Sequence, residues 1–380
     1  MPKTIGVLTG GGDVPGLNTV IQQLTLRAEK GYRVIGIKRG WGGLVYMDPK
    51  SEPNSDHFEE LTPNKVRIID RTGGTILHTS RVNPLKVESD RVFEEYKGFS
   101  FEGKRDFTDD VIKNLDKMNI DVLVTIGGDD TLSYSRHLMS LGRKVIGIPK
   151  TMDGDVCGTD YCIGFATAIT RANTNITRLR SSCGSHERIG VFEEFGRHSG
   201  LTALYSAVVA KVDRVLIPEV PFDMDRVIEL TIRDYRENPS KYAILLVAEG
   251  AKEIAGEELF KGEKQDGYGH KKLGGIGYII AGEFKKTGFE TVENPITYLL
   301  RSGEPDAKDK LYATVFADLS IDAISKGHTG TLTAIKDGKP TLVPLEITKN
   351  SPFKVDVERF YDTEQYRPKV SGFIDSCLIL

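Results

Sequence analysis

Residues 5–18 read IGVLTGGGDVPGLN, and this stretch decides the fold class. The apolar run Ile5–Thr9 predicts a short strand, the glycines predict a tight turn, and a helix is expected over residues 16–30. The same pattern of strand, turn and helix returns along the chain, with further strands predicted at residues 32–37, 122–126, 145–148, 188–193 and 243–248. Strands that alternate with helices form mostly parallel sheets covered by helices on both faces, so the expected fold class is α/β and doubly wound.

Three other segments depart from this alternation. Residues 329–345 predict a β-hairpin, because two apolar runs flank Lys-Asp-Gly-Lys-Pro, and Asp-Gly is a typical hairpin turn. Residues 49–63 and 251–272 are hydrophilic and are expected to form surface loops. The second of these is either a mobile segment beside the active site or a solvated insertion.

Composition excludes several classes of protein. The chain has 380 residues with a net charge of −3, so it has no global basic field and we expect no nucleic-acid partner. The longest apolar runs are about seven residues, against the ~20 that cross a bilayer, so no membrane association is expected. The four cysteines show no CxxC spacing, which favours reduced thiols in a cytoplasmic protein. Glycine is the outlier, with 40 residues, above the usual ~7%.

The common nucleotide-binding motifs are absent from the sequence. It contains neither GxxxxGK[ST] nor GxGxxG, and no HExxH or zinc-type cysteine spacing occurs. A phosphate-handling enzyme with this sequence would therefore bind phosphate through other glycine turns.

Two glycine turns follow buried strands and carry carboxylates. In the first, Gly10–Asp13, three glycines allow close backbone approach to an anion in front of a helix N-terminus; the alternative is an ordinary strand-to-helix turn. In the second, Gly127–Thr131, Asp129 and Asp130 suit a Mg²⁺ site. The alternative there is an aspartate N-cap, which explains one carboxylate but hardly both.

Two later segments carry further candidate groups. Lys150–Asp155 combines a cation with two carboxylates in a glycine-containing loop, which suits proton abstraction and phosphate binding. Arg197 lies between glycines where a helix is expected to start, and either clamps a phosphoryl group or contributes to a structural cap. Arg81, Glu249 and the Tyr298–Arg301 pair are inconclusive by spacing alone.

Taken together, the motifs resemble the phosphofructokinase family in kind, order and spacing over most of the chain. The matching segments are GGDVPGLN (11–18), GGTILHTSR (73–81), GGDDT (127–131), PKTMDGD (149–155), SHER (185–188), FGR (195–197) and AEG (248–250). One GGD-type motif is poor evidence, since NAD kinases carry similar runs, but seven segments in register are specific.

The resemblance implies transfer of a phosphoryl group to the 1-hydroxyl of fructose 6-phosphate, in glycolysis and reversibly. It assigns the general base to Asp153 and a Mg²⁺ ligand to Asp129. It implies contacts to the donor for Gly11, Arg81, Asp130 and Lys150, contacts to the transferring group for Thr151 and Arg197, and contacts to the sugar phosphate for Arg188, Phe195, Gly196, Glu249, Tyr298 and Arg301. In the family the residue matching Arg188 comes from a neighbouring subunit, so a homo-oligomer, dimer or tetramer, is expected.

The donor implied is pyrophosphate. ATP-dependent members usually have glycine where Asp130 and Lys150 stand, and a carboxylate at position 130 would repel the α-phosphate of ATP. The alternatives are an ATP-dependent phosphofructokinase, an NAD kinase, which leaves PKTMDGD unexplained, and a non-catalytic sugar-phosphate or nucleotide-binding regulator. The last is disfavoured because Asp129 and Asp153 are both present.

The resemblance also implies two domains with the active site in the cleft between them. We expect the first, donor- and Mg²⁺-binding domain to comprise residues 1–160 and 297–350. The second, sugar-phosphate-binding domain is expected to comprise residues 161–296 and 351–380.

Overall fold

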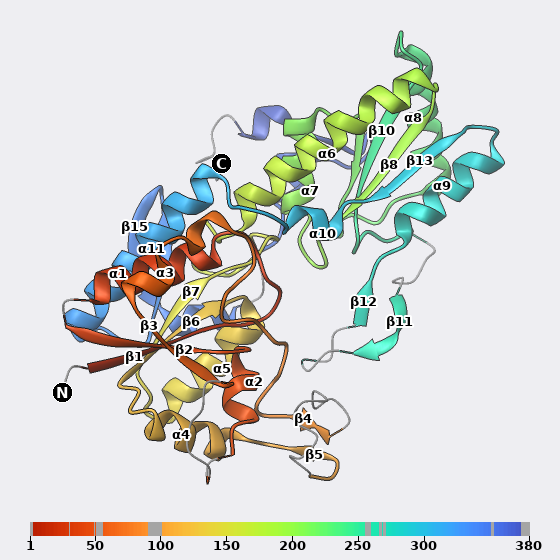
Figure 1. Ribbon diagram of the computed structural model, residues 1–380. Coiled ribbons are helices and arrows are strands. Elements are labelled where there is room, and N and C mark those ends of the chain that lie inside the picture. Colours follow the sequence, from red (N-terminus) through yellow and green to blue (C-terminus); the bar gives the residue numbers. More distant parts are fainter. Residues whose placement is uncertain are drawn as a thin grey trace.

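The structure, a computed structural model, is built around two sheets flanked by helices (Figure 1). It describes residues 3–29, 31–48, 50, 56–89, 101–254, 260–265, 268, 271–350 and 353–373. In this part of the chain, no helix is both long enough and apolar enough to span a membrane.

The first sheet has seven strands in the order β15-β14-β7-β6-β1-β2-β3. Its strands are β1 (Lys3–Thr9), β2 (Tyr32–Ile37), β3 (Phe58–Leu61), β6 (Val122–Gly127), β7 (Val145–Pro149), β14 (Thr331–Lys336) and β15 (Lys339–Pro344). The two edge strands, β3 and β15, are antiparallel to their neighbours and the other pairings are parallel. The helices around this sheet are α1 (Leu17–Ala28), α2 (Trp41–Val45), α3 (Pro63–Val66), α4 (Thr108–Lys117), α5 (Asp129–Ser140) and α11 (Ala307–Ser325).

The second sheet has four parallel strands in the order β13-β8-β10-β9. They are β8 (Ile189–Glu194), β9 (Arg214–Leu216), β10 (Ala243–Ala248) and β13 (Thr291–Pro295). The helices near it are α6 (Phe165–Ser185), α7 (Leu201–Ala210), α8 (Met224–Glu237), α9 (Ile276–Lys286) and α10 (Thr297–Leu300). Short elements complete the fold: β4 (Val87–Glu88), β5 (Lys104–Arg105), β11 (Phe260–Gln265), β12 (Lys271–Leu273), α12 (Val357–Phe360), β16 (Tyr361–Asp362) and β17 (Arg367–Pro368).

The predicted fold class and the C-terminal hairpin are confirmed. Strands β14 and β15 pair around Asp337 and Gly338, whose φ angles of +50° and +72° suit a turn with two left-handed residues. The two predicted surface loops are not irregular throughout, since residues 49–63 contain β3 and residues 251–272 contain β11 and most of β12, which form a hairpin. Residues 49, 51–55, 255–259, 266, 267, 269 and 270 of these segments lie outside the described part.

The domain boundaries stay a prediction, and the sheets supply facts that bear on them. The first sheet takes strands from residues 3–61, 122–149 and 331–344, and the second from residues 189–295. The segment after residue 353 packs on the second sheet, where the Tyr361 hydroxyl donates to the Val215 carbonyl (2.6 Å) and Arg214 donates to the Gln365 carbonyl (2.5 Å).

A continuous apolar core joins the two sheets. Ile5 and Val7 of β1 belong to a buried cluster that extends through α1, α11 and α6 to β8 and β10. Leu8, which points to the other face of β1, belongs to a second cluster with α4 and α5. Helix α6 therefore lies in the core between the sheets, where it packs on α11 beside the first sheet and on β8 of the second.

The start of α6 is held by a buried carboxylate from α11. Asp309 is 0% exposed and accepts four hydrogen bonds, from the Tyr161 hydroxyl (2.8 Å), Gly164 N–H (2.7 Å), and the Thr167 N–H (2.9 Å) and hydroxyl (2.5 Å). Two of the donors are backbone groups at the N-terminus of α6, which has no cap of its own. Burial raises the pKa of Asp309 to about 6 despite these donors, so the carboxylate is held at an electrostatic cost.

We expect Asp309→Ala to lower the free energy of unfolding by at least about 3 kcal/mol, because several buried donors lose their acceptor together. Asp318→Ala is the matched control, since Asp318 is on the same helix and 42% exposed in its ion pair with Arg27; it should cost less than about 1 kcal/mol. Urea unfolding of both variants measures the difference. Equal, small losses would show that Asp309 does not hold α6.

Candidate active site

The strand order of the first sheet reverses between β1 and β6. The chain proceeds from β1 to β2 on one side, and later places β6, β7 and β14 on the other side. Ligands of doubly wound sheets bind outside the carboxyl ends of the strands at such a point. The two glycine turns singled out in the sequence lie there, and Gly10 N–H donates to the carbonyl of Ile126 (2.9 Å).

The glycines of these turns serve two different purposes. A Cβ atom on Gly10 or Gly127 would overlap the Thr131 side chain, so both are required for packing. Gly11 has a φ of +79°, which glycine adopts readily, and a Cβ atom there would lie 3.3 Å from the Lys150 Nζ. The expectation that all three glycines of the first turn serve approach to an anion therefore needs correction at Gly10.

Three cationic side chains converge on the first turn. Lys150 is 4% exposed and its Nζ donates to the Gly12 carbonyl (2.6 Å). A Cβ atom on Gly12 would lie 3.1 Å from Nη1 of Arg301 and 3.7 Å from Nη2 of Arg81. Burial, and then the charge of Arg81, lower the pKa of Lys150 to about 8. A glycine turn surrounded by these cations suits a phosphate-bearing anion.

The loop after β7 connects this turn to the second sheet. The Met152 carbonyl accepts from the Thr202 hydroxyl of α7 (2.7 Å), and Asp153 N–H donates to the Thr151 hydroxyl (3.1 Å). Gly154 has a φ of +66°, which allows the loop to turn back. Thr151 and Asp153 are thereby held between the edges of the two sheets.

Asp153 lies among groups from three segments. Its pKa is well above the ordinary value, because of burial first and the charges of Asp155 and Glu249 next. The charge and the backbone N–H of Arg197 oppose this rise. A carboxylate with an elevated proton affinity at this position can accept a proton from a substrate hydroxyl.

Asp129, the predicted Mg²⁺ ligand, has the properties of a carboxylate that needs a cation. Its Oδ1 is buried and has no hydrogen-bond partner among the described residues. Burial, followed by the charges of Asp155 and Asp130, raises the pKa of Asp129 to about 7. In the part of the chain described, no group of three or more ligating side chains is arranged to hold a metal. The buried, unpartnered Oδ1 of Asp129 fits a cation such as Mg²⁺, which proteins usually bind through one or two carboxylates together with substrate phosphates.

The edge of the second sheet contributes the predicted sugar-binding residues. Phe195 and Tyr298 pack edge to face with ring centres 5.8 Å apart, and the Arg301 guanidinium lies 4.5 Å from the Tyr298 ring centre. Nε of Arg301 also lies 3.4 Å from Oδ1 of Asp13. Arg301 therefore contacts Asp13 beside the first sheet and Tyr298 beside the second.

The backbone at this edge is closely packed. Gly196 has a φ of +133°, and its carbonyl accepts from Gly250 N–H (3.1 Å). Glu249 N–H donates to the carbonyl of Glu194 (2.9 Å). These contacts place Phe195, Gly196 and Glu249 next to each other.

Arg188 is the one predicted site residue that lies elsewhere. It precedes β8, whereas Phe195 follows that strand, and seven extended residues span about 23 Å. Nη2 of Arg188 lies 3.9 Å from the Glu290 carboxylate at that far end. Arg188 does not reach the cleft of its own chain.

One local expectation was wrong, and one alternative is excluded. Arg197 does not open a helix, because α7 begins at Leu201 and Arg197 lies in the preceding loop. Neither Asp129 nor Asp130 is an N-cap, because α5 begins at Asp129 and its N-cap is Gly128. Both carboxylates therefore lie in the first helical turn, where negative charge is favourable.

Sequence reasoning missed the two glutamates that end β8. Glu193 accepts from Gly275 N–H (3.0 and 2.8 Å) and Gly277 N–H (2.9 Å) at the start of α9, where Gly274 and Gly275 have φ angles of +124° and +101°. Glu194 faces the opposite way and is completely buried. Two acidic residues at the end of an apolar strand were the available signal.

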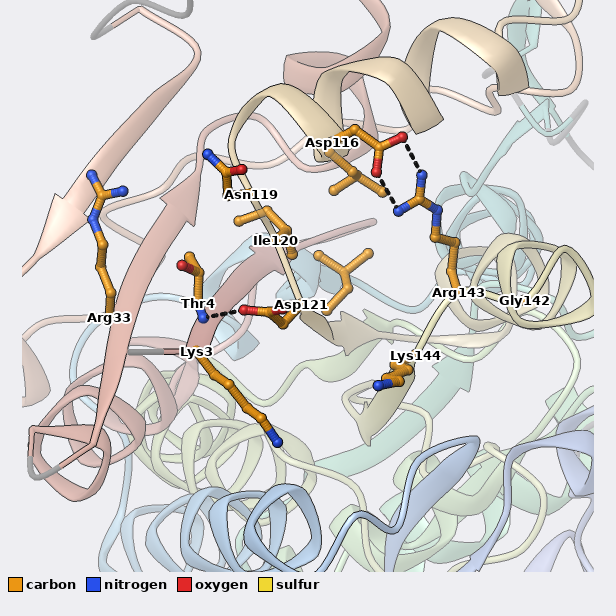
Figure 2. A pocket seen from close by; sticks show the side chains of 12 residues that line it. Lys3, Thr4, Arg33, Asp116, Asn119, Ile120, Asp121, Gly142, Arg143 and Lys144 are labelled. Carbon is orange, nitrogen blue, oxygen red and sulfur yellow. Dashed lines mark hydrogen bonds and ion pairs between the residues drawn. The ribbon is translucent and has the colours of Figure 1, made fainter. Parts of the chain in front are cut away.

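A cavity of about 700 Å³ at the other edge of the first sheet contains none of these residues (Figure 2). Three of its charged groups interact locally: Arg143 binds Asp116 through two contacts of 2.7 Å, and Asp121 accepts from Thr4 N–H (2.7 Å). It lies at the amino ends of the strands, away from the switch point, so we assign it no part in the chemistry.

Comparison with curated proteins gives close relatives over nearly the whole chain. The "Pyrophosphate--fructose 6-phosphate 1-phosphotransferase" of Dictyoglomus thermophilum is 36% identical over 90% of this chain and 92% of its own length. The "ATP-dependent 6-phosphofructokinase 3" of Streptomyces coelicolor is 34% identical over 95% of this chain and 98% of its own. Relatives named for either donor therefore match at similar identity.

Solved structures share the fold. A pyrophosphate-dependent phosphofructokinase from Nitrosospira multiformis superposes with a TM-score of 0.76 at 18% identity, over 98% of this chain and 90% of that chain. The phosphofructokinase from Saccharomyces cerevisiae gives 0.71 at 23% identity, and this chain spans 45% of its length. The family model described as Phosphofructokinase matches residues 4–324. The chain therefore belongs to the phosphofructokinase family of phosphotransferases.

Proposed function

We propose that this enzyme transfers a phosphoryl group from pyrophosphate to the 1-hydroxyl of fructose 6-phosphate, giving fructose 1,6-bisphosphate, reversibly and in cytoplasmic glycolysis. The observation that carries the proposal is the convergence of Lys150, Arg81 and Arg301 on the Gly11–Gly12 turn, beside the loop of Asp153. The names of the curated relatives support the sugar substrate.

Asp153 acts as the general base. It takes the proton of the 1-hydroxyl while the hydroxyl oxygen forms a bond to phosphorus and the bond to the leaving phosphate breaks. Its raised pKa suits this task, because a stronger base is better matched to an alcohol proton. Arg197, whose N–H and charge face Asp153, holds the base in place and lies where it can stabilise the transferring group.

Charge neutralisation does most of the remaining work, as in other phosphoryl transfers. Lys150, Gly11 and Arg81 bind the donor, and Thr151 contacts the phosphoryl group. Asp129 would hold Mg²⁺, which supplies positive charge to the phosphate oxygens when bound. Asp155 and Asp130 tighten that hold, since their charges already oppose the ionised form of Asp129 in the absence of a cation.

Tyr298, Arg301, Phe195, Gly196 and Glu249 form the sugar-phosphate site. Because Arg188 lies at the far end of β8, its predicted contact with the sugar phosphate requires a second copy of the chain. A homo-oligomer, dimer or tetramer, with shared sites is therefore part of the proposal.

The choice of donor rests on Asp130 and Lys150. Asp130 is close enough to influence the pKa of Lys150, and Lys150 occupies the space over Gly11. In this proposal Lys150 neutralises a short anion bound at Gly11, and the carboxylate of Asp130 repels the third phosphate of a longer donor. ATP is the alternative donor, favoured by relatives named as ATP-dependent at 34–35% identity.

The donor is tested by measuring turnover of fructose 6-phosphate and Mg²⁺ with pyrophosphate and with ATP in parallel. We expect kcat/KM for pyrophosphate to exceed that for ATP at least 100-fold. Equal or better turnover with ATP would contradict the assignment.

For the base, we expect Asp153→Asn to lower kcat by a factor of about 10²–10⁴, because the amide cannot accept the proton. Asp160→Asn is the control: Asp160 is exposed on the same segment, where it accepts from Asp337 N–H (2.7 Å). Steady-state rates should change less than about twofold in this control. Near-normal kcat in Asp153→Asn would remove Asp153 from the role of base.

For donor selection, we expect Asp130→Gly to reduce the preference for pyrophosphate over ATP at least about tenfold, since both charge and bulk are removed. Asp130→Asn keeps the size of the side chain and removes only its charge, so the two variants separate repulsion from steric exclusion. The ratio of kcat/KM for the two donors is the measurement. An unchanged ratio in both variants would place discrimination elsewhere.

A further inference from the structure

Glu194, the last residue of β8, is a buried acid that the proposed mechanism does not use. It is 0% exposed, and neither carboxyl oxygen has a hydrogen-bond partner among the described residues. The next residue is Phe195 of the sugar-binding edge, and the carbonyl of Glu194 accepts from Glu249 N–H. An acid of this kind, placed directly beneath the site, calls for a functional explanation.

The side chain of Glu194 faces α7. Successive residues of a strand alternate between faces, and Glu193 points to the start of α9. On the other face, the hydroxyl of Ser206 on α7 is also buried and lies near the Glu194 carboxyl without closing a hydrogen bond of normal geometry. One turn earlier on the same helix, Thr202 holds the Met152 carbonyl next to Asp153.

Among the described residues, no cation is a cause of the pKa shift of Glu194. Helix α7 presents Ser206, the loop after β7 presents Asp153, and the neighbouring strand β10 has only apolar residues. Burial first, and then the negative charge of Asp153, raise the pKa of Glu194 to about 8. An unpaired buried carboxylate is costly, so Glu194 carries its proton at neutral pH.

We propose that Glu194 is a positioning residue for Asp153: as a neutral acid it packs against Ser206 under the loop and keeps additional negative charge away from the sugar-phosphate site. This inference rests on the proposed function, in which Asp153 is the base and a phosphorylated sugar binds above it. When Glu194 loses its proton at alkaline pH, its charge adds to those of Asp153 and Glu249. A doubly charged sugar phosphate is then repelled.

The test compares wild type with Glu194→Gln, which is nearly isosteric and cannot ionise. We expect the KM for fructose 6-phosphate in the wild type to rise at least about threefold between pH 7 and pH 9, and the KM of Glu194→Gln to stay level. Glu229→Gln is the control, because Glu229 is an exposed glutamate of α8 with a side chain 67% exposed; it should follow the wild type. Calorimetric binding of fructose 6-phosphate without donor repeats the comparison independently of turnover.

The proposal is overturned when Glu194→Gln shows the same alkaline rise in KM and the same loss of binding as the wild type. A protein that turns over no sugar phosphate with any donor contradicts the proposed function instead, so the two failures are distinguishable. Ser206→Ala provides a second variant should Glu194→Gln fold poorly. The Ser206 hydroxyl favours the ionised form of Glu194, so its loss should move the alkaline rise to higher pH, and an unmoved rise also counts against the proposal.

Discussion

The buried carboxylate of Asp309 connects the parts of the fold on which the site depends. It reaches from α11 to the first turn of α6, and α6 lies in the core that joins the two sheets. The segment that leads into α6 carries Lys150 and Asp153. By fixing where α6 begins, Asp309 also fixes where this segment ends, so packing in the core and the position of the base are physically linked.

The cleft combines charges that would each be unfavourable alone. Lys150 is buried near two guanidinium groups. Across the loop, burial and the charge of Asp155 raise the pKa values of both Asp129 and Asp153. Arg301 bridges the two edges through Asp13 and the Tyr298 ring. Under the proposed function, a phosphorylated ligand bound with a cation would relieve both sets of repulsions at once.

Membership of the family leaves the donor undecided, because relatives named for pyrophosphate and for ATP are equally similar over the whole chain. The choice between pyrophosphate and ATP must therefore depend on a few local groups rather than on the fold. Asp130 and Lys150 are suited to this, since a helix N-terminal carboxylate and a buried ammonium change the charge that a donor meets without altering the sheet. In the inference drawn above, Glu194 likewise changes the charge that the sugar phosphate meets.

The pattern of neighbouring residues was sufficient to predict many of the strands and one hairpin of this protein. The apolar runs predicted β1, β6 and β7, and the Asp-Gly turn predicted the β14–β15 hairpin, because strand period and turn conformation depend on neighbouring residues. Only the tertiary structure decided the rest: that Gly10 accommodates Thr131, that Arg188 lies at the wrong end of β8 for its own cleft, and that Glu194 is buried with no hydrogen-bond partner among the described residues. The contacts of Gly10 with Thr131 and of Arg188 with Glu290 join residues far apart in the sequence, and local spacing carries no information about which face of a strand will be covered or by what.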